Sequence, residues 1–256
     1  PKCPTVTIPD NIDKLPGVET KINEVKFNAN DPAMFDFLKQ NGYVVVRGLV
    51  SSEQINKAKK GYEFIQRNLF EDISQSINDV ETEDSLCVNS TDCTKSISQV
   101  RDLFLREENE CSVFRELVDG DCTPNIVLAA QNAMNALDPE GQWTGIKLLH
   151  DHVITKPTGL RVSKRIPLHQ DRMFWPVDLP ACSTWVPLVD VPLNGGCMEL
   201  LTLASKPHLH HQSVRAVDFM ADEKMSGLKL VLEDDPHPVR WMVPMDAGET
   251  LIFSSH

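Results

Sequence analysis

Hydrophobic and polar positions follow two different patterns along the chain, and the change comes near Gly145. Before this point apolar residues recur every three or four positions, as in amphipathic helices. After it, short runs of β-branched and aromatic residues alternate with turns rich in Pro, Gly and Asn. The pattern predicts one domain over residues 1–256, with a mostly helical part over 31–140 and a β-rich core over 145–256. Residues 1–30, which are Pro-rich and weakly patterned, are expected to form an arm packed on the surface.

The first part contains clear signals for helix ends. Asp31 suits an N-cap, Pro32 suits the first helical turn, and Gly42 suits the position after the last turn of a helix written "DPAMFDFLKQNG". A strand, "YVVVRGLV", follows this helix. Three further segments are predicted to be helical: "SSEQINKAKKGYEFIQRNL", with Ile55, Ala58, Tyr62 and Ile65 on one stripe, "SISQVRDLFLRE" and "NIVLAAQNAMNAL". Residues 71–96 are acidic, rich in Ser and Thr and without a period, so they predict a flexible insert or lid.

The second part consists of short predicted strands. They read "GIKLLHDHVITKP", "STWVPLVDVP", "CMELLTLAS", "LKLVLED", "RWMVPM" and "ETLIFSS". Many short strands with regular turns are typical of a sandwich or barrel. The chain is therefore predicted to be mainly β with flanking helices.

Composition and charge narrow the classes of molecule that this protein is expected to bind. The formal net charge of −12 argues against nucleic acid or an anionic membrane as the main partner. No apolar run approaches the ~20 residues of a membrane span, and no signal peptide is visible. The seven cysteines contain no CxxC pair, which argues against a zinc ribbon and favours reduced thiols in an intracellular, cytoplasmic protein. A secreted form with disulfides is the alternative, because Asn89 begins a sequon, and an organelle is another, because an address could precede Pro1.

The stretch "RIPLHQDRMFWPVDLP" carries the main candidate chemistry. On an extended chain His169 and Asp171 lie on the same face. Two histidines and one carboxylate form a facial triad that leaves open positions on non-haem iron. A third ligand must come from a distant strand, and His256 is the best placed by sequence. The alternative is a loop histidine beside an aspartate with no metal.

The surrounding segments resemble the phytanoyl-CoA dioxygenase family of Fe(II)- and 2-oxoglutarate-dependent oxygenases. The similarity rests on "NGYVVVRGLVSSEQI", "LLHDHVITKPTG", "PLHQDRMFWPVDLP", "STWVPLVDVPLNGGCMELLTLASKPH" and "DAGETLIFSS", in the family's order. It implies a double-stranded β-helix, also called a jelly-roll or cupin-like barrel. It also implies that His169 and Asp171 bind iron, and that Trp185, His152 and Lys156 lie near 2-oxoglutarate. Asn194, Gly195 and Gly196 would form a turn between core strands, where small residues permit positive φ.

The resemblance further implies the reaction. Fe(II), 2-oxoglutarate and O2 would oxidise an unactivated carbon of a small organic substrate and release succinate and CO2. The retained carboxylate at Asp171 favours hydroxylation over halogenation. In the family the distal histidine is followed, about a strand later, by an arginine that binds 2-oxoglutarate. The distal histidine is therefore His256 or a residue beyond it, and the natural chain is expected to continue.

The substrate and the alternatives stay open at this point. Phe174 and Trp175 are candidates for a substrate wall or for packing at the barrel rim, and Arg165, on a basic loop, could recognise a carboxylate or phosphate. The "HDH" at residues 150–152 could hold a second metal or line the cofactor pocket, with Asp151 pointing away. A monomer or homodimer is expected. The rival functions are a binding or regulatory barrel that lacks the 2-oxoglutarate arginine, and a metal-dependent cupin enzyme that does not use oxygen.

Overall fold

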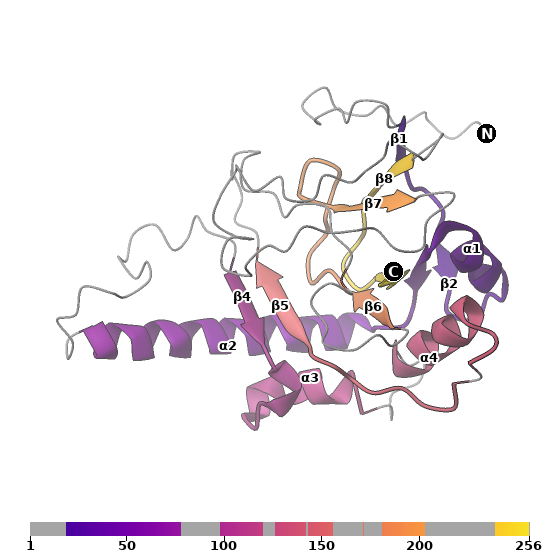
Figure 1. Ribbon diagram of the computed structural model, residues 1–256. Helices are drawn as coiled ribbons and strands as arrows, with labels where there is room; N and C mark the ends of the chain where they lie inside the picture. Colours follow the sequence, from indigo (N-terminus) through magenta and orange to yellow (C-terminus); the bar gives the residue numbers. More distant parts are fainter. Residues whose placement is uncertain are drawn as a thin grey trace, which may run out of the picture.

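The structure combines small sheets with flanking helices. This computed structural model describes residues 19–77, 98–119, 126–141, 143–155, 171, 181–202 and 239–255. Its helices are α1 (Ala33–Asn41), α2 (Ser52–Ile77), α3 (Ser112–Glu116) and α4 (Ile126–Leu137), with 3-10 turns η2 (Leu103–Leu105) and η3 (Asn109–Cys111). Its strands are β1 (Glu19–Ile22), β2 (Phe27–Asn28), β3 (Tyr43–Arg47), β4 (Ser98–Arg101), β5 (His152–Thr155), β6 (Cys182–Trp185), β7 (Met198–Thr202), β8 (Val239–Val243) and β9 (Thr250–Ser254). Figure 1 shows their arrangement.

Two sheets pack face to face to form the core. One has the order β2-β3-β9-β6 and the other the order β1-β8-β7. Their facing sides share a hydrophobic cluster, in which Val45 and Leu251 of the first sheet meet Val243 of the second. The rings of Tyr43 and Trp241 also meet across this interface, with centroids 6.3 Å apart. The described strands therefore form a two-layered sheet core, as the strand pattern predicted, but they do not close into a barrel.

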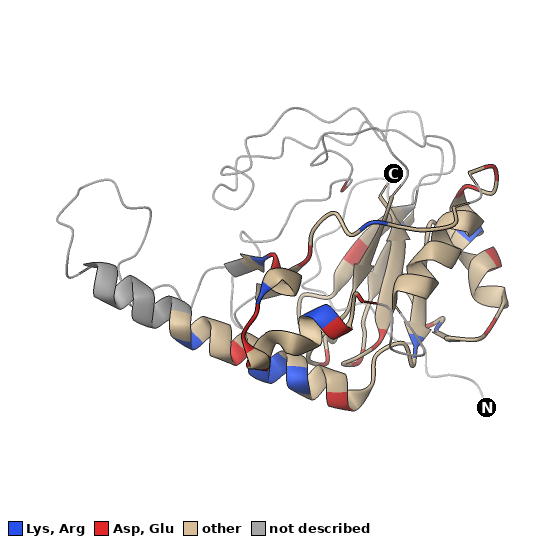
Figure 2. Cartoon of the chain, turned by 90° about the horizontal axis from the view of Figure 1, so that it is seen from below, with Lys and Arg blue, Asp and Glu red and all other residues tan. Residues whose placement is uncertain are grey.

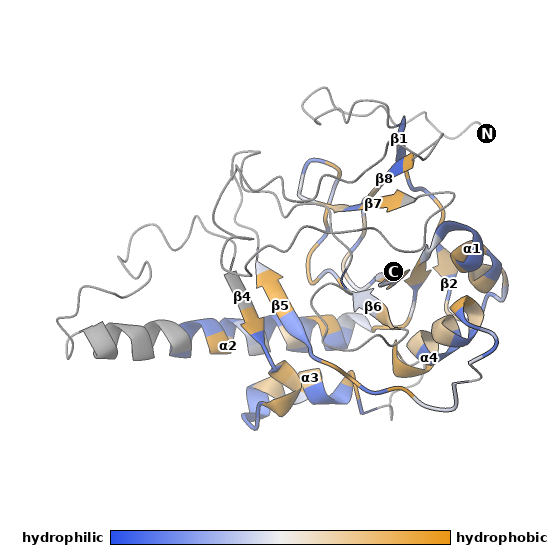
Figure 3. Cartoon of the chain, in the orientation of Figure 1, coloured by the Kyte–Doolittle hydropathy of each residue, from blue (hydrophilic) through white to orange (hydrophobic). Residues whose placement is uncertain are grey.

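Helices cover the other face of the first sheet. Val44, Val46 and Ile252 point to this side and pack in one cluster with Leu38 of α1 and Ala133 of α4. Figure 3 shows the hydrophobic character of α4, while the outer turns of α1 are hydrophilic. Along β3 and β9, consecutive side chains thus point alternately toward the helices and toward the second sheet, as expected for strands that are buried on both faces.

The third sheet pairs β4 with β5 and packs against α2. Val100 and Val153, which are opposite each other, pack with Tyr62 of α2 against one apolar cluster that includes Ala58 and Ile65 of the same helix. The Tyr62 hydroxyl also hydrogen-bonds to the Thr155 hydroxyl and accepts a hydrogen bond of 2.9 Å from Gln66 Nε2. One face of this two-stranded sheet is therefore fixed to α2. In the described part of the chain no helix is long and apolar enough to cross a bilayer, and α2 is amphipathic.

Local signals explain the helix boundaries. The Ser51 hydroxyl accepts from the Gln54 N–H at 3.1 Å, and the Gln54 side chain accepts from the Ser51 N–H at 2.9 Å. This capping box starts α2 at the predicted position. Helix α1 starts one residue later than predicted, after Pro32, although the Asp31 carboxylate still accepts from the Ala33 N–H at 3.0 Å. It ends at Gly42, whose φ of 75° is the left-handed value that glycine permits.

Three sequence predictions about elements were wrong. The segment "SISQVRDLFLRE" contains strand β4 and a 3-10 turn instead of a helix, because pairing with β5 outweighs its helical spacing and Asp102, at φ 57°, turns the backbone. The N-terminal arm includes β1 and β2, which pair in parallel with β8 and β3. Helix α2 runs to Ile77 and takes in the start of the predicted insert, because no Gly or Pro follows Gly61 within it. The rest of that insert and "LKLVLED" lie outside the described residues.

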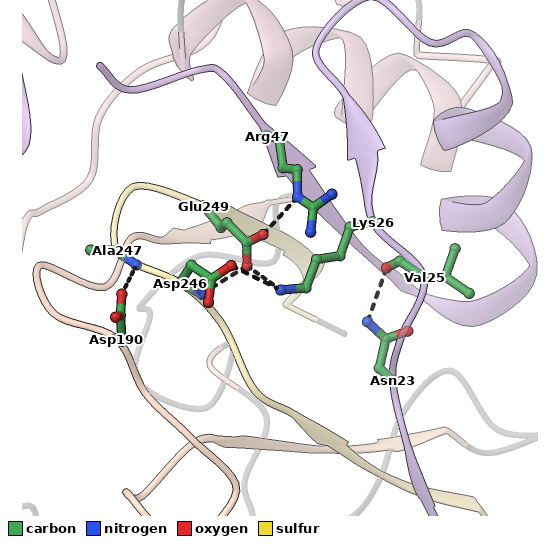
Figure 4. A network of polar contacts seen from close by, with 8 residues as sticks. All are labelled: Asn23, Val25, Lys26, Arg47, Asp190, Asp246, Ala247 and Glu249. Atoms are coloured by element: carbon green, nitrogen blue, oxygen red, sulfur yellow. Dashed lines mark hydrogen bonds and ion pairs between the residues drawn. The ribbon is translucent and has the colours of Figure 1, made fainter. Parts of the chain in front are cut away.

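A buried carboxylate ties the first sheet together near the turn before β9. Glu249, whose side chain is 6% exposed, accepts from Lys26 Nζ at 2.7 Å, Arg47 Nε at 2.8 Å and the Asp246 N–H at 2.9 Å (Figure 4). Burial would raise the pKa of Glu249, but these hydrogen bonds outweigh it and hold the pKa below its usual value. The turn also needs Gly248, with φ 87°. Strand β9 is thus fastened to β3 and to the segment between β1 and β2.

We expect Glu249→Gln to lower the free energy of unfolding at pH 7 by roughly 2 kcal/mol, because it leaves Lys26 and Arg47 without their buried anion. Urea unfolding measures this loss. The folded-state pKa is depressed, so the stabilisation is present above the unfolded pKa of about 4.3 and disappears as the pH falls through the folded value. Glu53→Gln is the control, since the exposed Glu53–Lys57 pair at 3.2 Å should contribute under about 0.5 kcal/mol. Equal losses in both variants would contradict this account.

Candidate functional site

The predicted metal carboxylate lies against the inner face of strand β6. The Ser183 hydroxyl donates a hydrogen bond to the half-buried Asp171 carboxylate. Ser183 is opposite Phe253, and Trp185 is opposite Leu251, which is buried between the two sheets. Residues two apart in a strand share a face, so Ser183 and Trp185 both point toward the second sheet. The structure therefore brings Asp171 to the face that also carries the predicted cosubstrate residue Trp185.

His152 approaches the same site from strand β5. It lies opposite Arg101 of β4, on the face turned away from α2. Its ring stacks on His150, with centroids 5.3 Å apart and planes inclined by 12°. Burial lowers the pKa of His152, and the positive charges of His150 and Arg101 lower it further, while the Asp171 carboxylate acts in the opposite direction. The Asp171 carboxylate is therefore close enough to influence the protonation of His152.

Asp151, between the two histidines, points away from the site as predicted. Its carboxylate accepts from the Phe104 N–H at 3.0 Å, and its backbone carbonyl accepts from the Asp102 N–H at 2.9 Å. Burial raises the pKa of Asp151, and the hydrogen bonds from backbone N–H groups only partly oppose this. Asp151 thus fastens the start of β5 to the turn at η2. It does not join His150 and His152 in a second metal site.

Cys182 is also separated from the site, on the opposite face of β6. Its Sγ lies 3.7 Å from the Ala130 carbonyl oxygen of α4, and burial raises its pKa to about 11. A thiol with this pKa stays protonated at neutral pH, and it faces α4, away from the Asp171 carboxylate. Cys111 and Cys197 are also buried, and the reduced state of the seven cysteines stays a prediction.

Several predicted site residues cannot be placed in this geometry. His169, Lys156, Phe174, Trp175, Arg165 and His256 lie outside the described residues. Within the described ranges, no three His, Cys, Asp or Glu side chains gather as a metal site. Asp171 nevertheless suits a divalent ion, because its oxygen donors are hard ligands and the hydrogen bond from Ser183 fixes its orientation. The turn Asn194-Gly195-Gly196 is where it was predicted, and Gly196 has a φ of 80°.

The sequence analysis did not identify Ser183 and Arg101 as neighbours of the candidate site residues. Ser183 could have been found, because its position two residues before Trp185 puts it on the same strand face. Arg101 could not, because "SISQVRDLFLRE" was assigned to a helix. Its place beside His152 depends on the pairing of β4 with β5.

Comparison with known proteins gives one family. The sequence model of the family "Phytanoyl-CoA dioxygenase (PhyH)" matches residues 38–256. Curated relatives include the peroxisomal phytanoyl-CoA dioxygenases of Bos taurus, 27% identical over 227 residues, and Homo sapiens, 25% identical over 228 residues. That of Mus musculus is 24% identical over 233 residues. Each match covers 85% of this chain and 59% of the relative, so the chain spans about three fifths of these proteins.

The hydrogen bond from the Phe104 N–H to Asp151 predicts how substitutions of Asp151 change the stability of the protein. Asp151→Ala should lower the free energy of unfolding by about 1–2 kcal/mol, because the Phe104 N–H loses its acceptor. Asp151→Asn should cost less than about 0.5 kcal/mol, since an amide oxygen can accept the same hydrogen bond without a buried charge. Chemical denaturation of both variants measures the difference. Equal destabilisation by Asn and Ala would show that the negative charge, and not the hydrogen bond, is what matters.

Proposed function

This chain belongs to the phytanoyl-CoA dioxygenase family, and on that premise we propose that it is an Fe(II)- and 2-oxoglutarate-dependent oxygenase that hydroxylates, or otherwise oxidises, an unactivated carbon of a small organic substrate. The observation that carries the proposal is the placement of Asp171. A hydroxyl fixes this carboxylate on the face that Trp185 shares, and His152 lies within reach of its charge. A side chain that binds a metal is typically held in its orientation by a further hydrogen bond, like the one from Ser183 to Asp171.

The roles of the remaining residues are proposed from the resemblance to the family. We propose His169, Asp171 and His256 as the metal ligands and Trp185, His152 and Lys156 as contacts of 2-oxoglutarate. Phe174, Trp175 and Arg165 would contact the substrate. The two facing sheets would be the walls of a double-stranded β-helix, and the site would open between them. The family's 2-oxoglutarate arginine has no counterpart up to His256.

Bound iron and 2-oxoglutarate would supply the oxidant that attacks a C–H bond, with succinate and CO2 as by-products. The protein's own part is to hold and shield these groups. Asp171 provides a negatively charged oxygen, and Ser183 fixes its direction. Trp185 packs against the buried cluster of Leu251 and Val243, which gives the site an apolar wall that excludes water. Because its pKa is lowered, His152 remains neutral at pH 7 and can donate or accept a hydrogen bond.

Anaerobic titration of the purified full-length protein with Fe(II) and 2-oxoglutarate tests the assignment. We expect a weak visible charge-transfer band in the wild type, lost in His169→Ala and in Asp171→Ala because each removes a metal ligand. Asp36→Ala is the matched control, since Asp36 is exposed on α1. Succinate release in the presence of O2 should follow the same pattern. A folded protein that gives no band, or a band that survives both ligand substitutions, would refute the proposal.

Ser183→Ala should weaken Fe(II) binding by about 10-fold, because Asp171 loses the hydrogen bond that orients it. Anaerobic calorimetric titration measures this affinity without requiring turnover. Thr184→Ala is the control, because Thr184 is the next residue of β6, is exposed, and points to the opposite face. Ser183→Thr, which keeps the hydroxyl, should restore most of the affinity. Wild-type affinity in Ser183→Ala would show that the hydrogen bond does not orient a metal ligand.

A further inference from the structure

A buried hydroxyl directly after strand β9 has no hydrogen-bond partner. The Ser255 side chain is 1% exposed, and its Oγ atom neither donates nor accepts a hydrogen bond in the described structure. Most buried hydroxyls in proteins are paired, because an unpaired one has lost its hydrogen bonds to water and gained none in return. The Ser255 hydroxyl is therefore available to a group that binds beside it.

The backbone places Ser255 on the inner face of the first sheet. Its N–H donates to the Ala181 carbonyl oxygen at 3.2 Å, so the pairing of β9 with β6 extends to this residue. Side chains alternate along a strand, so Ser255 shares a face with Phe253, which lies opposite Ser183. The unpaired hydroxyl is thus diagonally across the two strands from the Ser183 hydroxyl, which holds Asp171.

The other hydroxyls on this face already have partners. Ser183 donates to the Asp171 carboxylate, and the Tyr43 hydroxyl donates to the Asn23 side-chain oxygen at 3.3 Å. Strands β6 and β9 contain no charged residue, and Figure 2 shows that charged residues lie mostly on helix α2 and on connecting segments. Among the described hydroxyls of this face, Ser255 is therefore the one left to bind a ligand.

A second unpaired hydroxyl belongs to the same strand but lies on its opposite face. Thr250 is 0% exposed, and its Oγ1 atom also lacks a partner. Because residues two apart share a face, Thr250 lies on the side of Ile252, which packs against the helices. The sheet separates it from Asp171. Its position on the inner face, and not burial alone, is therefore what distinguishes Ser255.

We propose that the Ser255 hydroxyl donates a hydrogen bond to a carboxylate oxygen of 2-oxoglutarate bound between the two sheets. A hydrogen bond to an ionised carboxylate is roughly twice as strong as one between neutral groups, so a carboxylate is the partner that gains most from this donor. Ala181, which lies opposite, has a methyl side chain and offers no competing acceptor. Trp185, the proposed cosubstrate contact on β6, points to the same face.

The inference rests on the proposed function and extends it. The resemblance to the family assigns Trp185, His152 and Lys156 to the cosubstrate, and it assigns no role to Ser255. The assignment of Ser255 comes from its burial, its unpaired Oγ atom and its position beside the Ser183–Asp171 hydrogen bond.

Thermal unfolding without ligands tests whether the hydroxyl is unpaired. We expect Ser255→Ala to leave the melting temperature unchanged or to raise it, because the substitution removes a buried polar atom that has no partner. Thr250→Val, which replaces the second unpaired hydroxyl by a methyl group, should behave in the same way. A melting temperature lowered by more than about 4 °C in Ser255→Ala alone would reveal a structural hydrogen bond and overturn the proposal.

Anaerobic titration of the Fe(II)-loaded full-length protein with 2-oxoglutarate tests the contact itself. Ser255→Ala should weaken 2-oxoglutarate binding about tenfold, the effect of losing one hydrogen bond to a charged group. Ser255→Cys keeps most of the volume but has a weak donor, so it should weaken binding as well. Thr250→Val is the matched control and should bind 2-oxoglutarate like the wild type. Fe(II) affinity, measured by calorimetry without 2-oxoglutarate, should stay within about twofold in all three variants.

The outcomes separate this proposal from the proposed function. A wild-type protein that forms no charge-transfer band would reject the oxygenase and, with it, the role of Ser255. A normal wild-type band with unchanged 2-oxoglutarate affinity in both Ser255 variants would reject the role of Ser255 alone. An equal loss of Fe(II) affinity would also overturn it, because the substitution would then act on a metal ligand such as the next residue, His256. Circular dichroism checks that each variant is folded.

Discussion

The position of strand β9 between β3 and β6 is the constraint on which the candidate site depends. Leu251 and Ile252 are both 0% exposed, and they point to opposite faces of the sheet, one toward the second sheet and one toward the helices. Burying each side chain contributes about 2–3 kcal/mol, and a slip of one residue would exchange the two faces. The register is therefore strongly fixed. Because β6 pairs with β9 in this register, Ser183 and Trp185 must face inward, and Asp171 follows through its hydrogen bond to Ser183.

Sequence reasoning succeeded where the determining interactions are local. The capping box at Ser51, the glycine that ends α1 and the run of valines in β3 are all readable within a few residues. It failed where the partner is remote in sequence. Strand β1 is defined by parallel pairing with β8, more than two hundred residues away, and nothing in "ETKI" indicates that partner. In β4 the local helical spacing was misleading, because the pairing with β5 decides the conformation.

In the candidate site, too, local features could be predicted from the sequence, whereas neighbours that are remote in sequence could not. The spacing of His169 and Asp171, and the resemblance of the surrounding segments, indicated a chemistry and a set of residues. The structure places Asp171 on the face of β6 that also carries Trp185, and the Asp171 charge influences His152. The neighbours that orient or accompany them come from pairing across strands, which a single sequence does not encode in readable form. The alternation of side chains along β6 is sufficient to predict that Ser183 and Trp185 share a face. Arg101 could not be placed in this way, because its segment was predicted to be a helix.

The two faces of strand β5 have different neighbours, because one packs against α2 and the other carries His152. Thr155 and Val153 fasten one face to α2 through Tyr62, and His152 lies on the other, with Asp151 holding the start of the strand against η2. Helix α2 approaches η3 closely at Gly61, where a Cβ atom would meet the Glu110 carbonyl oxygen at 2.6 Å. His152 is therefore positioned by the apolar packing and the backbone hydrogen bonds behind it, as well as by its stacking on His150. The packing of β5 on α2 therefore determines that His152 lies on the face turned away from that helix.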